Sequence, residues 1–332
     1  MRELEIERQF NIKIEKMVPN KGIYELSTNE GRRCLKKINY GVQKLHFIYG
    51  AKEHLINNGF KDIDRYFLSG DENPYAIVNE DIYTLSEWIE GREADFQNDE
   101  DIMLASKALA NLHIASRGYE PPENSKLKTD LGRWPYLMDK RITSFGKMKN
   151  MVRKKKNKKT DFDIQYINSM DFYKDLGIKA MEILKESQYE NLCMLEEETK
   201  GFCHHDFTYH NIIMGENEKV NIVDFDYCKR EVRVYDLANF IIKVLKRREW
   251  DIEVCKKIID SYNQVEPLKE EEYKVLYAFL VFPQRFWRLC NRYYYNESSW
   301  VQTTFINKIT SLCGEKELFS KFLEDFKTTY EL

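Results

Sequence analysis

The first part of the chain alternates between apolar and polar residues. Alternating runs at 11–16, 22–28 and 32–38 are separated by turn sequences at 19–22 and 29–31. A period of two is typical of strands that bury one face. These runs therefore predict a three-stranded meander.

Helical spacing replaces the alternation between residues 42 and 58, and Gly59 follows as a stop signal. Further strands are predicted at 65–69, 75–79 and 82–89. Later helices are predicted from Asp99, near 164–189, from Tyr235, near 251–264 and at 269–296, the last kinked or divided at Pro283. We therefore predict an α+β fold with a β-rich N-terminal lobe at 1–88 and a mostly helical C-terminal lobe at 89–332.

The segment at about 118–160 is predicted to be an irregular insertion in the helical lobe. Lysine and arginine dominate its end, from Lys147 to Lys159. Such a run indicates either an acidic or phosphate-rich partner or a mobile, solvated segment, and the second alternative is the more common one.

Charge and cysteine content narrow the class of protein. The 332 residues include 52 basic and 55 acidic side chains, and this net charge of −3 argues against a dedicated nucleic-acid-binding protein. The seven cysteines are scattered without a CxxC or zinc spacing, which is typical of reduced thiols in the cytoplasm. The charged N-terminus has no apolar signal core, and no window approaches about 18 uncharged apolar residues, so no membrane span is expected.

The stretch at 201–239 gathers the candidate chemistry. Two apolar runs flank the polar turn at 215–219, which predicts a hairpin that brings Asp206, Asn211 and Asp224 to one end. Carboxylate and amide oxygens are ligands that suit Mg²⁺. We therefore predict a phosphoryl-transfer centre in this stretch.

Each of these side chains has a physical task in such a centre. Asp206 would accept or orient the proton of an attacking hydroxyl, while Asn211 and Asp224 would hold the metal that bridges the phosphates of ATP. Positioning and charge neutralisation carry most of this reaction. A zinc site formed by the three histidines of the stretch is the alternative, but no spacing such as HExxH supports it.

The N-terminal lobe offers the other half of an ATP site. Lys36 and Lys37 on the third strand point to opposite faces, and both would be solvated in the simplest interpretation. We favour Lys36 as the lysine that holds the nucleotide phosphates, and we predict that Glu53 on the next helix pairs with it. Glu87 and Ile89, at the end of the last strand, are predicted to offer backbone groups to the purine.

The motifs resemble those of a known group of enzymes. The HxDxxxxN motif, the IVDFD strand end and the YDLAN segment are similar to those of the aminoglycoside phosphotransferase and choline kinase group. The chain resembles the CotS family of spore coat proteins more closely, through segments at 34–36, 51–60, 88–93 and 282–287. The resemblance implies a bilobal protein-kinase-like fold that uses ATP and Mg²⁺.

The resemblance also implies residue roles and shows two departures. Asp206 matches the catalytic aspartate, and Asn211 and Asp224 match the metal ligands. Asp226 stands where protein kinases carry a glycine, as in the phosphotransferase branch, which argues against a regulated protein kinase. The turn at 18–22 is not a GxGxxG loop, so fewer backbone N–H groups are expected to cover the phosphates.

Two functions remain open from the sequence. The first is an ATP-dependent phosphotransferase that acts on a hydroxyl of an unidentified small molecule and is associated with the spore coat. The alternative is a structural or scaffold coat protein that keeps the kinase fold with little or no turnover. The expected partners are the small-molecule acceptor and, by resemblance, other coat proteins, with no nucleic acid and no membrane. The expected location is the cytoplasm, and the resemblance implies the spore coat.

Overall fold

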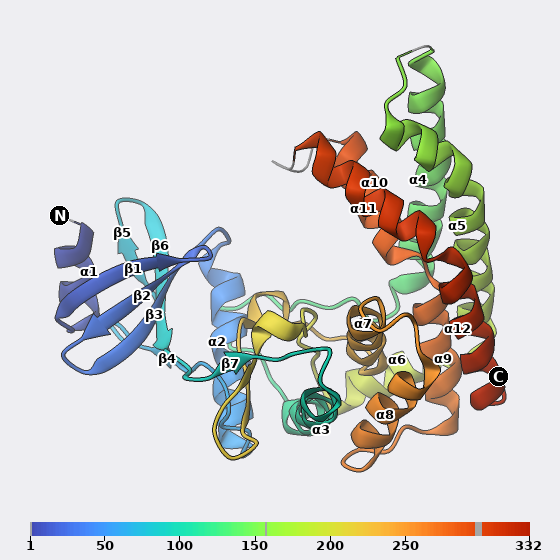
Figure 1. The fold of residues 1–332 in the computed structure, drawn as a ribbon. Coiled ribbons are helices and arrows are strands. Elements are labelled where there is room, and N and C mark those ends of the chain that lie inside the picture. Colours follow the sequence, from blue (N-terminus) through green and yellow to red (C-terminus); the bar gives the residue numbers. More distant parts are fainter. Residues whose placement is uncertain (1, 157, 296–300) are drawn as a thin grey trace. The chain divides into compact units, whose positions relative to one another are not determined.

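The computed structural model describes residues 2–156, 158–295 and 301–332 (Figure 1). The chain forms two units, each assembled from two segments of the sequence. The first contains Met1–Thr129 and Thr199–Glu231, and the second contains Asp130–Glu198 and Val232–Leu332. The predicted lobe boundary at residues 88–89 lies inside the first unit. The division into a nucleotide-binding lobe and a catalytic lobe stays a prediction.

Two antiparallel sheets organise the first unit. The larger sheet has the order β1-β2-β3-β6-β4, and β5 pairs with β6. Its strands are β1 (Ile14–Asn20), β2 (Ile23–Thr28), β3 (Gly31–Ile38), β4 (Tyr66–Phe67), β5 (Ala76–Val78) and β6 (Asp81–Glu87). The smaller sheet joins β7 (Arg92–Glu93), β8 (Ile212–Met214) and β9 (Val220–Ile222) in that order. The predicted meander and the predicted later strands are confirmed.

The first strand extends further than predicted and includes Pro19. We predicted this strand at 11–16, but β1 runs through Pro19 to Asn20 and pairs with β2 alone. Proline cannot donate to a ladder, so it is tolerated on an edge strand such as this one. The strand therefore reaches further towards the turn than the alternation of its residues indicated.

Helices cover the sheets of the first unit. They are α1 (Arg2–Phe10), α2 (Val42–Asn57) and α3 (Asp99–Ser116), with the short 3₁₀ turns η1 (Tyr209–Asn211) and η2 (Phe225–Tyr227). Ile6 and Phe10 of α1 pack with Leu26, Leu35 and Tyr83 in the core beneath the larger sheet. The helix predicted at 42–58 is confirmed as α2, and its inward face brings side chains to the candidate site.

The second unit is entirely helical in its described residues. Its helices are α4 (Trp134–Lys154), α5 (Asp161–Lys185), α6 (Tyr189–Thr199), α7 (Val234–Leu245), α8 (Ile252–Asn263), α9 (Glu270–Val281), α10 (Gln284–Tyr294), α11 (Gln302–Gly314) and α12 (Lys316–Thr329). The long helix α5 packs against α4, α9 and α11. The predicted division at Pro283 is confirmed, because α9 ends before it and α10 begins after it.

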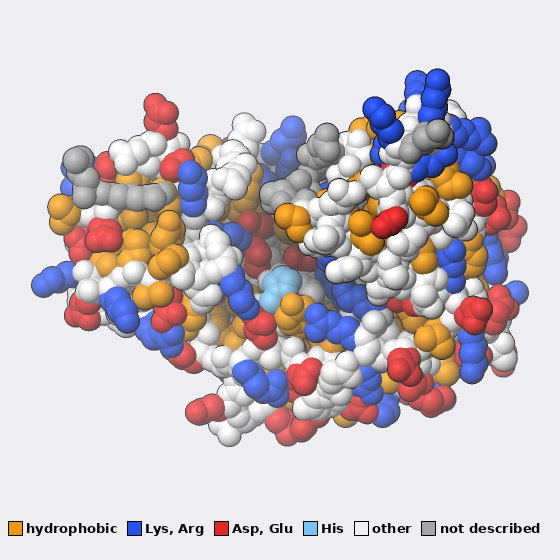
Figure 2. All heavy atoms as spheres, turned by 45° about the horizontal axis from the view of Figure 1, so that its top comes forward, with side chains coloured by type: hydrophobic (Ala, Val, Ile, Leu, Met, Phe, Trp, Pro, Cys, Tyr) orange, Lys and Arg blue, Asp and Glu red, His pale blue; other side chains and the backbone are white. Residues whose placement is uncertain are grey.

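The prediction of an irregular insertion at 118–160 is wrong for its second half, which forms α4. Trp134, Met138, Phe145 and Met148 are buried at helical spacing. Lysines and other polar residues occupy the remaining positions, so the apolar stripe is narrow and its period is hard to see in the sequence. The basic run covers the end of α4, and Figure 2 shows lysine and arginine side chains gathered at this end of the helical unit.

Two further findings concern the composition of the chain. All seven cysteines are free thiols. Within the described residues, the helices lack the length and apolar character that a membrane crossing requires.

Candidate functional site

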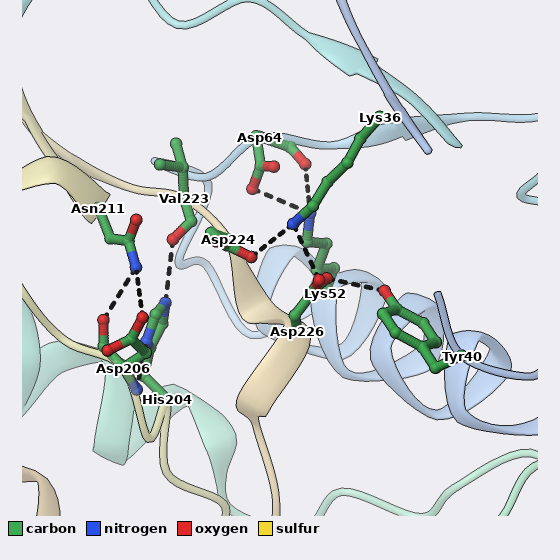
Figure 3. Close-up of polar contacts among 10 residues, drawn as sticks. All are labelled: Lys36, Tyr40, Lys52, Asp64, His204, Asp206, Asn211, Val223, Asp224 and Asp226. Atoms are coloured by element: carbon green, nitrogen blue, oxygen red, sulfur yellow. Dashed lines mark hydrogen bonds and ion pairs between the residues drawn. The ribbon is translucent and has the colours of Figure 1, made fainter. Parts of the chain in front are cut away.

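The β8–β9 hairpin brings the two halves of the sequence motif together. Ile212 pairs with Ile222 at its open end, and the N–H of Val223 donates to the carbonyl of Asn211 at 3.0 Å. Asp224 follows directly, so Asn211 and Asp224 flank the same end of the hairpin, as predicted (Figure 3). The hairpin therefore determines the spacing of the two predicted metal ligands.

His204 connects the loop before the hairpin to the loop after it. The N–H of Asp206 donates to Nδ1 of His204 at 3.2 Å, and Nε2 of His204 lies 3.0 Å from the carbonyl oxygen of Val223. Because Nδ1 accepts a hydrogen bond, the ring proton lies on Nε2 and is donated to Val223. The buried imidazole is thus used on both nitrogens, which is a structural role and not that of a zinc ligand.

Asn211 is oriented by Asp206. Its Nδ2 donates to the backbone carbonyl of Asp206 at 2.9 Å and lies 3.4 Å from Oδ2 of the Asp206 carboxylate. This orientation leaves the amide oxygen Oδ1 for a cation. The same contacts fix the loop around Asp206, so the Asn211 side chain also positions the predicted catalytic residue.

Lys36 lies between two carboxylates. Its Nζ is 2.7 Å from Oδ1 of Asp224 and 2.9 Å from Oδ2 of Asp226. The hydroxyl of Tyr40 donates to Oδ1 of Asp226 at 2.7 Å. Asp224 has a left-handed backbone, with φ of 65° and ψ of 68°, which is uncommon for a residue other than glycine and is typical of functional sites. We refer to Lys36, Asp224 and Asp226 as the carboxylate cluster (Figure 3).

Lys36 and Asp224 favour each other's charged form. Burial alone would raise the pKa of Asp224, but the nearby Lys36 ammonium more than offsets it, and the pKa is lowered. Burial would likewise lower the pKa of Lys36, but Asp226 and Asp224 raise it above its ordinary value. Two carboxylates face one ammonium, so the cluster has an excess negative charge that a divalent cation would neutralise.

The predicted ion pair between Lys36 and Glu53 is wrong in this structure. Glu53 binds Arg65 instead, with Nε to Oε1 at 3.0 Å and Nη2 to Oε2 at 2.7 Å. The inward position of α2 belongs to Lys52, one residue earlier. An α-helix turns by about 100° per residue, so a helix that points Lys52 inwards turns Glu53 aside.

Lys52 is the site residue that the sequence analysis missed. It is fully buried, and its Nζ lies 2.8 Å from the carbonyl of Asp64 and 2.9 Å from Oδ1 of the same residue. The ammonium also lies 3.8 Å from the centre of the Tyr66 ring. A lysine on a helix is normally solvated, so composition and spacing gave no signal for this buried pair.

The predicted purine contacts lie at the end of β6. The N–H of Glu87 donates to the carbonyl of Arg65 at 3.0 Å, so this amide is already used within the protein. Ile89 follows β6 in a segment without regular structure. Glu87 and Ile89 therefore stay predictions, and the geometry favours the backbone of Ile89 as the amide donor.

Comparisons with known proteins agree with this architecture. The sequence matches the family model for "Spore coat putative kinase YutH" over residues 3–326. Spore coat protein S of Bacillus subtilis (strain 168) is 24% identical over 316 residues, which cover 93% of this chain and 88% of that protein.

Solved phosphotransferases share the fold. An aminoglycoside phosphotransferase from Alicyclobacillus acidocaldarius subsp. acidocaldarius DSM 446 has a TM-score of 0.86 at 19% identity, covering 100% of this chain and 96% of the other. The AMP-bound complex of a spectinomycin phosphotransferase has a TM-score of 0.69 at 13% identity, covering 95% of each chain. These likenesses confirm the predicted kinase-like α+β fold. With the family match over nearly its whole length, the chain belongs to the spore coat putative kinase YutH family.

Proposed function

We propose that this protein is a spore-coat-associated phosphotransferase that uses Mg-ATP to phosphorylate a hydroxyl of a small molecule. The observation that carries the proposal is the carboxylate cluster, whose two aspartates follow the same β8–β9 hairpin that Asp206 and Asn211 precede. The names of the similar proteins support it, since one is an aminoglycoside phosphotransferase, one is a phosphotransferase bound to AMP, and one is a spore coat protein.

The oxygen donors of the site fit Mg²⁺. Asp224, Asp226 and the amide oxygen of Asn211 would hold the ion, and carboxylate and amide oxygens are the donors that Mg²⁺ prefers. Bound ATP would supply the phosphoryl group, and the Mg²⁺ ion would neutralise the negative charge of the phosphates. Lys36 would then exchange a carboxylate partner for phosphate oxygens, while Glu87 and Ile89 would meet the purine. Glu53 would act only indirectly, through Arg65.

Asp206 would orient the acceptor hydroxyl and take up its proton at the carboxylate. The hydrogen bond from its N–H to His204 and the contacts from Asn211 fix the loop on which it lies. Such fixed positioning is the main contribution that a protein makes to phosphoryl transfer.

The test combines ligand binding with a turnover screen. Mg-ATP at 100 times its Kd should stabilise the wild type by about 2.7 kcal/mol, visible as a raised melting temperature. Asp224→Asn should lose this shift, whereas Asp206→Asn should keep it and lose phosphorylation of any acceptor found. Asp71→Asn, an exposed change, is the matched control. The proposal is overturned if neither ATP nor ADP shifts the wild type with Mg²⁺ present.

A structural coat role is the second candidate function. The tight β1–β2 turn favours it, because it offers few backbone amides to ATP phosphates. Asp206→Asn combined with Asp224→Asn separates the two candidates in sporulating cells. Normal coat assembly with the double variant would favour the scaffold role, and a coat defect matching that of the deletion would favour turnover.

A further inference from the structure

The tip of the β1–β2 hairpin is a two-residue turn. Asn20 pairs with Ile23, and the residues between them, Lys21 and Gly22, have φ values of 46° and 92°. Two consecutive positive φ angles are typical of a type I′ turn. So short a turn cannot wrap a phosphate chain with backbone amides, and the one polar side chain at its tip is Lys21.

This tip lies at the same end of the sheet as Lys36. Tyr24 of β2 pairs with Leu35 of β3, so the next pair outwards places Ile23 opposite Lys36. The turn continues past that point. Lys21 therefore lies beyond the position of Lys36, at the end of the sheet where Lys36 contacts Asp224 and Asp226.

Lys21 also contacts a segment that packs on the loop between Asp206 and Asn211. Its Nζ lies 2.7 Å from Oε1 of Glu93 in β7. The residue after Glu93, Ala94, donates its N–H to the carbonyl of Tyr209 at 3.2 Å, within the loop between Asp206 and Asn211. The Lys21–Glu93 ion pair thus connects the hairpin tip to the segment packed on the catalytic loop.

The ion pair is open to solvent. The Lys21 side chain is 77% exposed and that of Glu93 is 37% exposed. Exposed ion pairs contribute little to stability and are screened by salt. A polyphosphate that enters between the hairpin and the loop carries more negative charge than one carboxylate, so it would compete well for the Lys21 ammonium.

We propose that Lys21 is a phosphate-binding residue of this nucleotide site and that Glu93 holds it when no nucleotide is bound. Nucleotide entry would break the Lys21–Glu93 ion pair and transfer the ammonium to the polyphosphate. One side chain would then replace part of the cover that a glycine-rich loop provides. This inference rests on the proposed function.

The test is titration of the full chain with ATP, ADP and adenosine in Mg²⁺ by calorimetry. Lys21→Gln should weaken ATP and ADP binding about tenfold and leave adenosine unchanged, as expected for one lost charge-assisted contact. Glu93→Gln should tighten ATP binding about two- to threefold, since it removes the competitor. Lys16→Gln, a change at an exposed lysine of the preceding strand β1, is the matched control and should change nothing.

The outcomes separate this inference from the proposed function. A wild type that binds ATP while Lys21→Gln binds it equally well would overturn the role of Lys21 and leave the phosphotransferase proposal intact. Equal losses for ATP and adenosine would also overturn it, because they indicate general damage. A wild type that binds none of the nucleotides overturns both.

A second inference comes from the end of the α4–α5 hairpin. This end is firmly built: Nζ of Lys155 lies 2.9 Å from both carboxylate oxygens of Asp163, and the Phe162 ring stacks on Tyr293 at 3.9 Å. Thr160 caps α5 in a capping box with Asp163. The described residues on either side of position 157 are therefore held by specific side-chain contacts.

Exposed basic side chains surround this end. Six of them make no ion pair with any described residue, and we call them the basic end: Lys147, Arg153, Lys154, Lys156, Lys158 and Lys159. Figure 2 shows the gathered lysine and arginine side chains. Without these six, the chain has 46 basic against 55 acidic residues, so positive charge is concentrated here while the rest is acidic.

We propose that the basic end docks an acidic segment of another polypeptide. Flexible ammonium groups suit carboxylates spread along a chain, and the charges are complementary. Among the described residues 147–156 and 158–164, Ile164 is the one large apolar side chain that is exposed, and a single such side chain disfavours insertion into a membrane or stacking of bases.

Fluorescence anisotropy with labelled polyglutamate tests this surface. The triple variant Lys154→Glu, Lys156→Glu and Lys158→Glu should weaken binding more than tenfold. The matched control reverses three other exposed lysines of the helical unit, Lys174, Lys185 and Lys321, and should change binding less than twofold. Equal losses in both variants, or tighter binding of duplex DNA or anionic vesicles than of polyglutamate, would overturn the proposal.

Discussion

The two units differ in how their charged and aromatic side chains are arranged. In the first unit, Lys52 is fully buried against Asp64, and Lys36 lies between Asp224 and Asp226. In the second unit, the core is aromatic, with Phe286 stacked on the ring of Tyr173 at 3.9 Å. Buried ions lose hydration and seldom improve stability over apolar packing. The second unit also buries ion pairs, such as Arg233 with Glu272, but each of these cations has carboxylates that balance it within the fold. The first unit differs because two carboxylates share the partly exposed Lys36 ammonium, which leaves negative charge that a cation could neutralise.

Removing one charge from the carboxylate cluster is the strongest test of whether its charges serve ligand chemistry or stability. Asp224→Asn should lower phosphotransferase turnover by about 100- to 1000-fold, because it deletes a charge aimed at the reacting phosphate. The melting temperature without ligand should stay close to that of the wild type. A variant that unfolds instead would show that the cluster serves stability. Steady-state kinetics and thermal melting give the two measurements.

Truncating Lys52 tests the ion pair whose ammonium is fully buried. Lys52→Ala leaves the Asp64 carboxylate without its cation, so the free energy of unfolding should fall by about 3–5 kcal/mol. The matched control is Lys37→Ala, which removes an exposed ion pair with Asp81 and should cost less than about 1 kcal/mol. Denaturant titrations compare the two, and equal losses would contradict the importance of burial.

The aromatic core predicts a loss of similar size through a different mechanism. Phe286→Ala leaves a cavity beside Tyr173 and Tyr166, so the free energy of unfolding should fall by about 3–5 kcal/mol. Tyr136→Ala, with a side chain that is 61% exposed, should change it by less than about 0.5 kcal/mol. Adding Tyr173→Ala should then cost less than it does alone, since the stacked partner is gone.

Acid pH should produce the smallest effect, at Asp101. Hydrogen bonds from Arg92, at 2.5 and 2.8 Å, lower the pKa of this carboxyl. Its stabilising contribution is therefore present above the unfolded pKa of about 3.9 and is lost as the pH falls through the lower folded pKa. Asp101→Asn should cost on the order of 1 kcal/mol at pH 7. The gap to the wild type should narrow towards pH 3 in denaturant titrations, and a constant gap would contradict this linkage.

Local patterns predicted more of the fold than of the site. The alternation before residue 38 and the helical spacing at 42–58 correctly predicted the meander and α2. Periodicity failed for α4, where basic residues narrow the apolar stripe of the helix to a few positions such as Phe145 and Met148. The motif residues Asp206, Asn211 and Asp224 were found because they are close in sequence and a short hairpin joins them.

The sequence by itself predicted most of the strands and helices, though not α4, and the candidate acidic and amide ligands beside the hairpin, since these depend on neighbouring residues. Only the tertiary structure decided the partners of the lysines. Lys36 meets Asp224 across 188 residues of sequence. Lys52, and not Glu53, points inwards because the docking of α2 sets its rotation, and one residue along a helix turns a side chain by about 100°. The local sequence pattern does not specify this rotation of α2. The burial of Lys52 beside Asp64 therefore became visible only in the folded chain.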